Sequence, residues 1–273
     1  MPTQDVTRIQ VENTAIRSRF LDRIVLIDFY YQDDPNSSVK PALLLINDGQ
    51  DLTKFSFSTL LQRMYEHGET IFPLLCVGIH CGTDRKMEYG VAGTTDYKGR
   101  GARAGLYTSF VLEELMPFIQ LRYPFSFREK GIAGFSLGGL MALDIAWNHP
   151  VVFTYVGVFS ASLWWRNIDQ DALEYDDDKH RIMHQRIRES GYKQGLKFFF
   201  QCGNKDETKD RNRNGIIDSI EDTRDMVKEL FDKGYHPEKD IRYLEMPDGH
   251  HDVFTWGRAM PEFFKWALSR DLS

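Results

Sequence analysis

The sequence of 273 residues has few cysteines, no long apolar run and no excess of positive charge. Three cysteines without Cys-x-x-Cys spacing indicate neither a disulfide framework nor a zinc site; they are Cys76, Cys81 and Cys202. No segment approaches the roughly 18 apolar residues that a membrane-spanning helix needs. The formal net charge of -6 argues against a nucleic-acid partner, because binding phosphates requires a basic surface.

The N-terminal residues lack the basic and apolar segments of a signal peptide. We therefore expect a soluble protein of the cytoplasm, without a membrane partner, unless an upstream signal was removed. The 42% of hydrophobic residues suffice for a large core, and a chain of this length suits one domain.

The apolar residues form short runs that alternate with helical patterns. Runs that are apolar on both faces are typical of strands in a parallel sheet covered by helices. Strands are predicted over 23–30, 41–46, 72–79, 131–134, 155–159, 196–201 and 241–246, and helices over 60–67, 106–121, 137–148, 223–233 and 259–269. This order predicts an α/β fold, with a mostly parallel, doubly wound sheet and helices on both faces. We expect a single domain over 1–273, with a polar excursion at 164–192 and a loop insertion at 204–222.

A Gly-x-Ser-x-Gly motif occupies residues 134–138, between a predicted strand and the helix that starts near Leu137. A sharp strand-to-helix turn needs glycines beside the serine, because the backbones approach closely there. The N-terminus of the following helix favours developing negative charge. The motif predicts Ser136 as a nucleophile, and a glycine-rich turn with an inert serine is the alternative.

A serine nucleophile needs a histidine base and an orienting acid, which in α/β-hydrolases follow the serine as acid, then histidine. The strand over 241–246 runs into a turn that holds His250 and His251, either of which suits the base. The strand over 196–201 runs into a turn with two carboxylates. Asp206 is the predicted orienting acid, and Glu207 is the alternative.

The backbone N–H groups of Leu137 and of Gln50, on the loop after the strand 41–46, are predicted to form the oxyanion hole. Four residues on loops at the same sheet edge are predicted to line the substrate pocket: Arg85, Tyr89, Trp164 and Trp165. Core packing is the alternative for the tryptophans. The basic residues of this region favour an anionic or polyhydroxylated substrate, with a solvated basic face as the alternative; they are Arg85, Lys98, Arg100 and Arg103.

These segments resemble the esterase family that includes the enterochelin esterases, esterase D, the feruloyl and acetyl esterases of carbohydrate esterase family one, and the mycobacterial mycolyltransferases. The resemblance rests on 43–51, on 111–117 with Tyr123 after it, on 134–139 and on the histidine turn, and it covers nearly the whole chain. It implies the α/β-hydrolase fold and ester chemistry. The family often has a tryptophan five residues after the catalytic histidine, which Trp256 provides for His251, and an acid three residues after the strand-end glycine, which implies Asp206.

Residues 210–221 match the calcium-loop pattern D-x-[DN]-x-[DN]-G-x5-E at every defined position. In such a loop, six oxygen ligands surround Ca²⁺ and a glycine at position six, here Gly215, makes the sharp turn. The predicted ligands are Asp210, Asn212, Asn214, the carbonyl of Ile216, Asp218 and Glu221. We expect a structural ion that stabilises the segment carrying Asp206, and no organic cofactor; a solvated polar loop is the alternative.

Together these features predict a serine esterase that hydrolyses a small-molecule carboxylic ester through an acyl-enzyme intermediate, using a catalytic triad of Ser136, Asp206 and His251. Two alternatives remain open. One is acyl transfer to another alcohol on the same fold, and the other is a non-catalytic, calcium-dependent binding protein with a hydrolase scaffold. The acyl group, the alcohol and the oligomeric state are not specified by the sequence.

Overall fold

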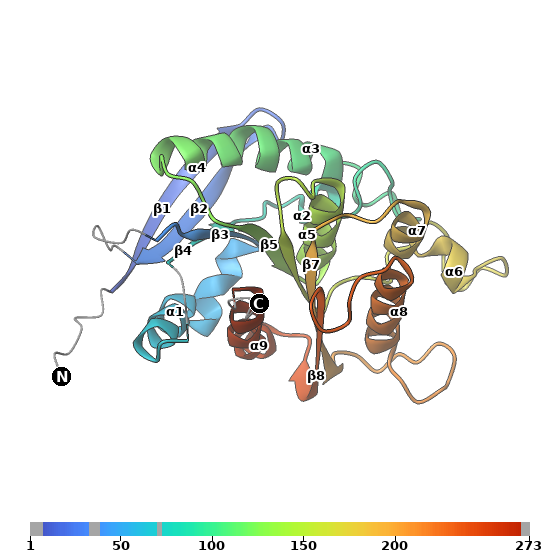
Figure 1. Ribbon diagram of the computed structural model, residues 1–273. Helices are drawn as coiled ribbons and strands as arrows, with labels where there is room; N and C mark the ends of the chain where they lie inside the picture. The colour runs from blue at the N-terminus through green and yellow to red at the C-terminus, as the bar shows by residue number, and fades with distance from the viewer. Residues whose placement is uncertain (1–7, 33–38, 70–72, 269–273) are drawn as a thin grey trace.

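The computed structural model describes residues 8–32, 39–69 and 73–268. Its eight-stranded sheet has the order β1-β2-β4-β3-β5-β6-β7-β8 (Figure 1). The strands are β1 (Ile9–Ser18), β2 (Arg23–Gln32), β3 (Ala42–Asn47), β4 (Leu74–Ile79), β5 (Lys130–Phe135), β6 (Tyr155–Phe159), β7 (Lys197–Lys205) and β8 (Ile241–His250). β1 pairs antiparallel with β2, and β2 antiparallel with β4, whereas the remaining pairs are parallel.

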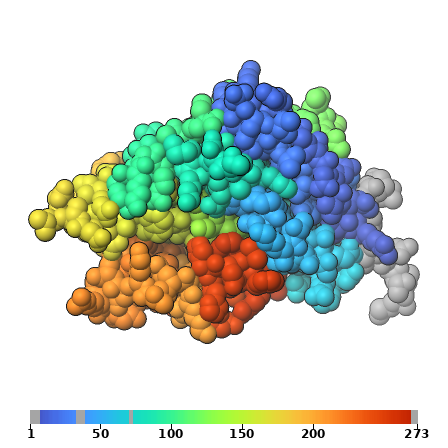
Figure 2. Space-filling model, turned by 180° about the vertical axis from the view of Figure 1, so that it is seen from behind, coloured from blue at the N-terminus to red at the C-terminus, as the bar shows by residue number. Residues whose placement is uncertain are grey.

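Helices cover both faces of the sheet because its central strands are apolar on both sides. Every residue of β3, β4 and β6 is buried. One face carries α3 (Ala104–Ser109), the π-helical η2 (Phe110–Leu115), α4 (Met116–Arg122), α5 (Leu137–Asn148), α7 (Ile182–Glu189) and α8 (Asp218–Asp232). The other carries the 3-10 helix η1 (Gly49–Phe55), α1 (Phe57–Glu66) and α9 (Val253–Ala267). Figures 1 and 2 show α9 beside α1. The predicted α/β fold, with a mostly parallel sheet between two helical layers, is confirmed.

The long helix predicted over 106–121 is observed as one run, α3, η2 and α4, from Ala104 to Arg122. Pro117 lies in the first turn of α4, directly after the π-helical segment. Proline is tolerated in a first turn because its missing N–H is not needed there, and the π-helical turn changes the hydrogen-bonding pattern before it.

The polar excursion predicted at 164–192 contains two helices that were not predicted, α6 (Asp177–His180) and α7. α7 packs on the core through Ile182, Met183 and Ile187, so this part covers the sheet face instead of passing over its edge. A four-residue helix, α2 (Arg85–Glu88), and the edge strand β1 were also not predicted. None of the helices in the described ranges combines the length and apolar character needed to cross a bilayer.

Candidate active site

Ser136 forms the sharp turn between β5 and α5. Its backbone angles are φ 53° and ψ -121°, a conformation that a residue with a side chain rarely adopts. The turn depends on its glycines: a Cβ on Gly134 would lie 2.2 Å from the Gly138 carbonyl oxygen, and one on Gly138 would lie 2.5 Å from Asp48 Oδ2. Strained residues of this kind cluster at functional sites, where the surrounding structure holds them in place.

The loop after β3 packs directly onto this turn. The Asn47 side chain donates from Nδ2 to the Gly138 carbonyl over 2.8 Å and accepts from the Tyr107 hydroxyl over 2.8 Å. Asp48, in the left-handed region at φ 60°, precedes η1, and Gln50 is the second residue of that helix. The loop that carries the predicted donor Gln50 therefore lies against the start of α5, where Leu137 is located.

Arg85 connects the loop after β3 to the end of β5. Its Nε and Nη2 donate to the two carboxylate oxygens of Asp48, each over 2.7 Å, and Nη2 lies 3.4 Å from the Phe135 carbonyl oxygen. This bidentate pair occupies most of the guanidinium, so Arg85 has a structural role in joining the β3 loop to β5, in addition to lying near the predicted pocket.

Two of the predicted pocket residues lie in the core instead. Tyr89 is 0% exposed and its ring packs edge-on against Tyr107, with centroids 4.9 Å apart. Trp165 is 1% exposed. Both side chains are too deeply buried for a substrate to touch them. Large rings gain more free energy from burial in the core than from a position in an open pocket. Trp164 is half-buried and lines a surface hollow together with Arg100 and Arg166.

His251 lies on the same edge as Ser136, at the junction of β8 and α9. Its imidazole meets the Trp256 ring edge-on, with centroids 5.4 Å apart and an angle of 85°. Trp256 in turn stacks on Phe135, the residue before Ser136, at 4.9 Å and 6°. His250, the last residue of β8, pairs with Lys205 in the sheet, and both histidines are exposed.

The two adjacent carboxylates after β7 have different surroundings. Asp206 Oδ2 accepts from the Gly203 N–H over 3.1 Å, and the charge of Asp206 acts on His251. Glu207 Oε1 accepts from the Ser219 N–H over 2.8 Å, at the start of α8. The charge of Asp206 thus influences His251, whereas the Glu207 carboxylate is hydrogen-bonded at the start of α8.

Burial dominates the electrostatics of this pair. Desolvation raises the pKa of Asp206, an effect that the Gly203 N–H and the charge of His251 partly offset. Desolvation also lowers the pKa of His251, while the Asp206 charge raises it and Arg85 lowers it further. The net downward direction for His251 favours a neutral imidazole at neutral pH, which is the form that can accept a proton.

Direct hydrogen bonds do not connect Ser136, His251 and Asp206 in this structure. Within the described ranges, Asp206 Oδ1 and Ser160 Oγ are buried without a hydrogen-bond partner, and no hydrogen bond joins His251 to Asp206 or to Ser136. Such contacts often tighten only when a substrate binds. Ser160, which has φ 40° and follows β6, was not singled out from the sequence; its position at a strand end was the available signal.

Side chains within the loop at 210–221 accept hydrogen bonds from its own backbone. Asp210 accepts from the N–H of Gly215 over 2.8 Å, Asn212 from that of Asn214, and Asn214 from that of Ile216. Gly215 has φ 85°, as the sharp turn requires.

Glu221 closes the loop from its far end. Its Oε1 accepts from the side-chain amides of Asn212 (2.6 Å) and Asn214 (2.8 Å), and its Oε2, which has no hydrogen-bond partner, lies 3.4 Å from Arg211 Nη2. Among the described residues, no three His, Cys, Asp or Glu side chains are arranged to hold a metal ion. The ligand set predicted for this loop also includes two asparagines and a backbone carbonyl. The side-chain and backbone oxygens of this loop are of the kind that a hard cation such as Ca²⁺ binds.

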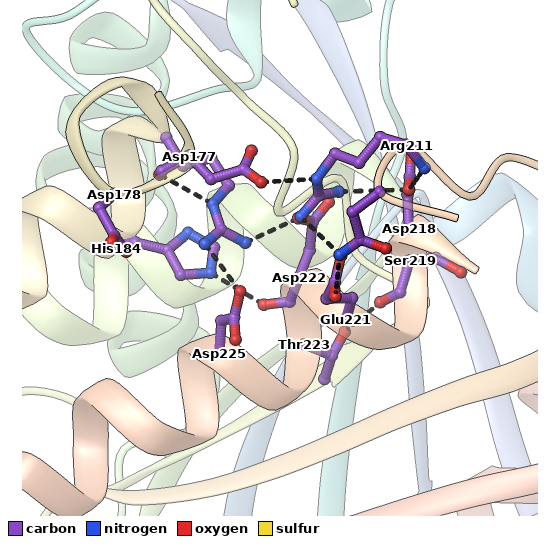
Figure 3. Close-up of polar contacts among 12 residues, drawn as sticks. Asp177, Asp178, His184, Arg211, Asp218, Ser219, Glu221, Asp222, Thr223 and Asp225 are labelled. Carbon is purple, nitrogen blue, oxygen red and sulfur yellow. Dashed lines mark hydrogen bonds and ion pairs between the residues drawn. The ribbon is translucent and has the colours of Figure 1, made fainter. Parts of the chain in front are cut away.

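Arg211, the second residue of this loop, connects it to two other segments (Figure 3). Its Nε donates to Asp177 in α6 and its Nη2 to Asp222 in α8, each over 2.7 Å. Arg181 reaches the same Asp222 oxygen over 2.8 Å. This buried network, which the sequence did not indicate, links the loop to the 164–192 excursion.

The sheet, the strained serine turn and the histidine at the same edge define an α/β-hydrolase. The chain belongs to the esterase family: the family model described as "Putative esterase" matches residues 20–267. It is therefore a carboxylic ester hydrolase. No curated protein matches the sequence significantly.

Solved structures share the fold at low sequence identity. A ferulic acid esterase aligns over 96% of this chain and 98% of its own, with TM-score 0.69 and 16% identity. The siderophore hydrolase EstB from Aspergillus nidulans aligns over 96% of both chains, with TM-score 0.69 and 17% identity. The enterobactin esterase FES from Shigella flexneri, solved in the presence of enterobactin, gives TM-score 0.72 and 19% identity; the match covers 95% of this chain but only 58% of that one.

Proposed function

We propose that this esterase hydrolyses a small-molecule carboxylic ester in two steps through an acyl-enzyme. Ser136 Oγ attacks the ester carbonyl carbon while His251 accepts the hydroxyl proton, and Asp206 orients the imidazole. The imidazolium then returns this proton to the departing alcohol. Water, deprotonated by His251, cleaves the acyl-enzyme and releases the acid.

The oxyanion of each tetrahedral intermediate lies, in this proposal, between the backbone N–H groups of Leu137 and Gln50. The contact between the β3 loop and the start of α5, through Asn47 and Gly138, supports this pairing. Loss of one such donor typically lowers the rate by about 10²- to 10³-fold.

The observation that carries the proposal is the strained backbone of Ser136 at the sheet edge where the His251 turn also begins. The φ of 53° at the start of α5 and the ring contacts of Trp256 with Phe135 and His251 support this pairing. A non-catalytic binding protein has no need for a strained serine at an edge that also carries a histidine and an acid with shifted pKa values.

The test compares turnover of 4-nitrophenyl acetate by the wild type, Ser136→Ala and Ser58→Ala, a serine in α1 that serves as the matched control. We expect Ser136→Ala to lose on the order of 10⁶-fold in kcat and Ser58→Ala to remain within about twofold. Equal turnover by Ser136→Ala and the wild type would exclude this nucleophile. Addition of competing alcohols, with analysis of the ester products, distinguishes hydrolysis from acyl transfer.

We further propose that the loop at 210–221 binds one structural Ca²⁺. Its ligands are Asp210, Asn212, Asn214, the Ile216 carbonyl, Asp218 and Glu221. The ion supplies a fixed positive charge that orders these oxygens, while the protein residues carry out the ester chemistry. Asp218 donates its N–H to the Lys209 carbonyl over 2.8 Å, so ordering the loop also orders the segment that follows Asp206 and Glu207.

A further inference from the structure

A hollow of about 200 Å³ lies beside the proposed active site. Its lining includes Tyr97, Arg100, Trp164, Arg166 and Glu207. Two links join it to the catalytic edge. Glu207 directly follows Asp206, and Trp164 comes two residues after Ser162, whose N–H donates to the Ser136 carbonyl over 3.1 Å.

The two arginines of this hollow differ in how their charge is balanced. Arg100 donates from Nε to Asp96 over 2.7 Å, and the Asp96 side chain is fully buried. This pair neutralises Arg100 inside the protein, where its guanidinium lies over the rings of Trp164 and Trp165. Arg100 therefore belongs to the wall of the hollow.

Arg166 has aromatic neighbours in place of an acid. Its guanidinium carbon lies 5.9 Å from the Tyr97 ring, 5.7 Å from the Trp164 ring and 5.6 Å from the Tyr175 ring. Its Nε is buried without a hydrogen-bond partner, and none of the carboxylates in the described ranges pairs with it. Aromatic rings hold a cation in place but do not satisfy its N–H donors, which remain available to a ligand.

The carboxylates of the hollow already have other partners. Glu207 accepts from the Ser219 N–H, and Asp218 accepts from the Arg211 N–H over 2.8 Å. At the rim, the exposed Lys98 and Lys209 add positive charge. The lining thus holds four basic side chains against two carboxylates, so the hollow favours an anion. Its volume is similar to that of the cavity of about 150 Å³ that accommodates benzene in another protein.

We propose that Arg166 is the anion-binding residue of a substrate subsite for a planar aryl carboxylate group of the ester. Its guanidinium fork matches the two oxygens of a carboxylate, and the Tyr97 and Trp164 rings flank the aromatic part. This inference rests on the proposed function, because the hollow acts as a subsite only if the ester reacts at Ser136.

The experiment uses two pairs of aryl esters that differ only by a carboxylate or its neutral amide. 4-Carboxyphenyl acetate and 4-carbamoylphenyl acetate carry the group on the alcohol part; phenyl hydrogen terephthalate and phenyl 4-carbamoylbenzoate carry it on the acyl part. For each ester, kcat/KM of the wild type is divided by that of Arg166→Gln. Arg122→Gln, which removes another arginine over an aromatic ring, is the matched control.

We expect Arg166→Gln to lower kcat/KM by about 10-fold or more for the carboxylate of at least one pair, and to change its amide partner by less than about twofold. Arg122→Gln should change neither. Equal effects on carboxylate and amide in both pairs would overturn the inference. If Arg166→Gln does not fold, as judged by circular dichroism, Arg166→Lys provides the same comparison, because lysine keeps the charge but loses the planar fork.

The Ser136→Ala variant separates this inference from the proposed function. If Ser136→Ala retains turnover of the carbamoyl-substituted esters, Ser136 is not the nucleophile and the proposed function is wrong. If turnover depends on Ser136 but not on the carboxylate, only the subsite is wrong.

Discussion

The indole of Trp256 lies parallel to the phenyl ring of Phe135, with centroids 4.9 Å apart and planes 6° apart. The same indole meets the His251 imidazole edge-on. One side chain that is 7% exposed therefore connects the strand before Ser136 to the proposed base. Because aromatic contacts have preferred geometries, Trp256 restricts where the imidazole can lie.

This geometry predicts that Trp256 is a positioning residue. In Trp256→Phe the stack on Phe135 is retained, and we expect kcat to stay within about fivefold of the wild type. In Trp256→Ala we expect kcat to fall by about 10- to 100-fold with KM nearly unchanged, because a misplaced catalytic group affects the chemical step. Stopped-flow turnover is measured below the melting temperature of both variants. If Trp256 had a purely structural role, folded Trp256→Phe and Trp256→Ala would have the same kcat.

The second prediction concerns pH. The midpoint of the acid limb of kcat/KM reports the pKa of His251 in the free enzyme, and we expect it below the ordinary value of 6.5, since the base must be neutral. In Asp206→Asn the carboxylate that raises this pKa is removed, so the midpoint should move to still lower pH. The plateau rate should fall by about 10⁴-fold. An upward movement of the midpoint would show that Asp206 is not the partner of His251.

Glu207→Gln is the matched variant for the neighbouring carboxylate. Because glutamine keeps an oxygen that can accept from the Ser219 N–H at the start of α8, the replacement should change the free energy of unfolding by less than about 1 kcal/mol. The rate with 4-nitrophenyl acetate should change little. A loss of kcat as large as that of Asp206→Asn would instead identify Glu207 as the orienting acid.

The calcium proposal predicts a thermal shift. At a free Ca²⁺ concentration about 100 times Kd, binding adds about 2.7 kcal/mol, which corresponds to a rise in Tm of roughly 5 to 10 °C. Glu221→Gln should lose most of this rise, because position twelve supplies two ligand oxygens. Asp232→Asn, which removes an exposed carboxylate of α8 paired with Lys228, should keep it. Equal Tm values in Ca²⁺ and in chelator would contradict the proposal.

Much of the fold followed from local patterns. The strand 155–159 and the helix 137–148 have the predicted bounds, because a run apolar on both faces and a small-residue helix after a glycine turn are strong local signals. The edge strand β1 was missed because its residues are largely exposed and alternate only weakly between apolar and polar. Neighbouring strands, not local sequence, determine such an edge.

The parts of the site that depend on contacts between distant segments could not be predicted from the sequence. Ser136 stands at the turn that its flanking glycines predict. Tyr89 and Arg166 show the limit, because the first was expected in the pocket and lies in the core, while the second was not singled out. Burial and charge pairing depend on segments far apart in the chain, as does the network of Arg211 with Asp177 and Asp222.

The central claim is that His251 activates Ser136 as a nucleophile, and covalent labelling tests it most directly. The protein is incubated with a fluorophosphonate, and the modified residue and the labelling rate are determined by mass spectrometry of the intact chain and its peptides. We predict a single adduct on Ser136, formed at least about 10³-fold more slowly in His251→Ala. An adduct at another residue, or labelling of His251→Ala at the wild-type rate, would contradict the account.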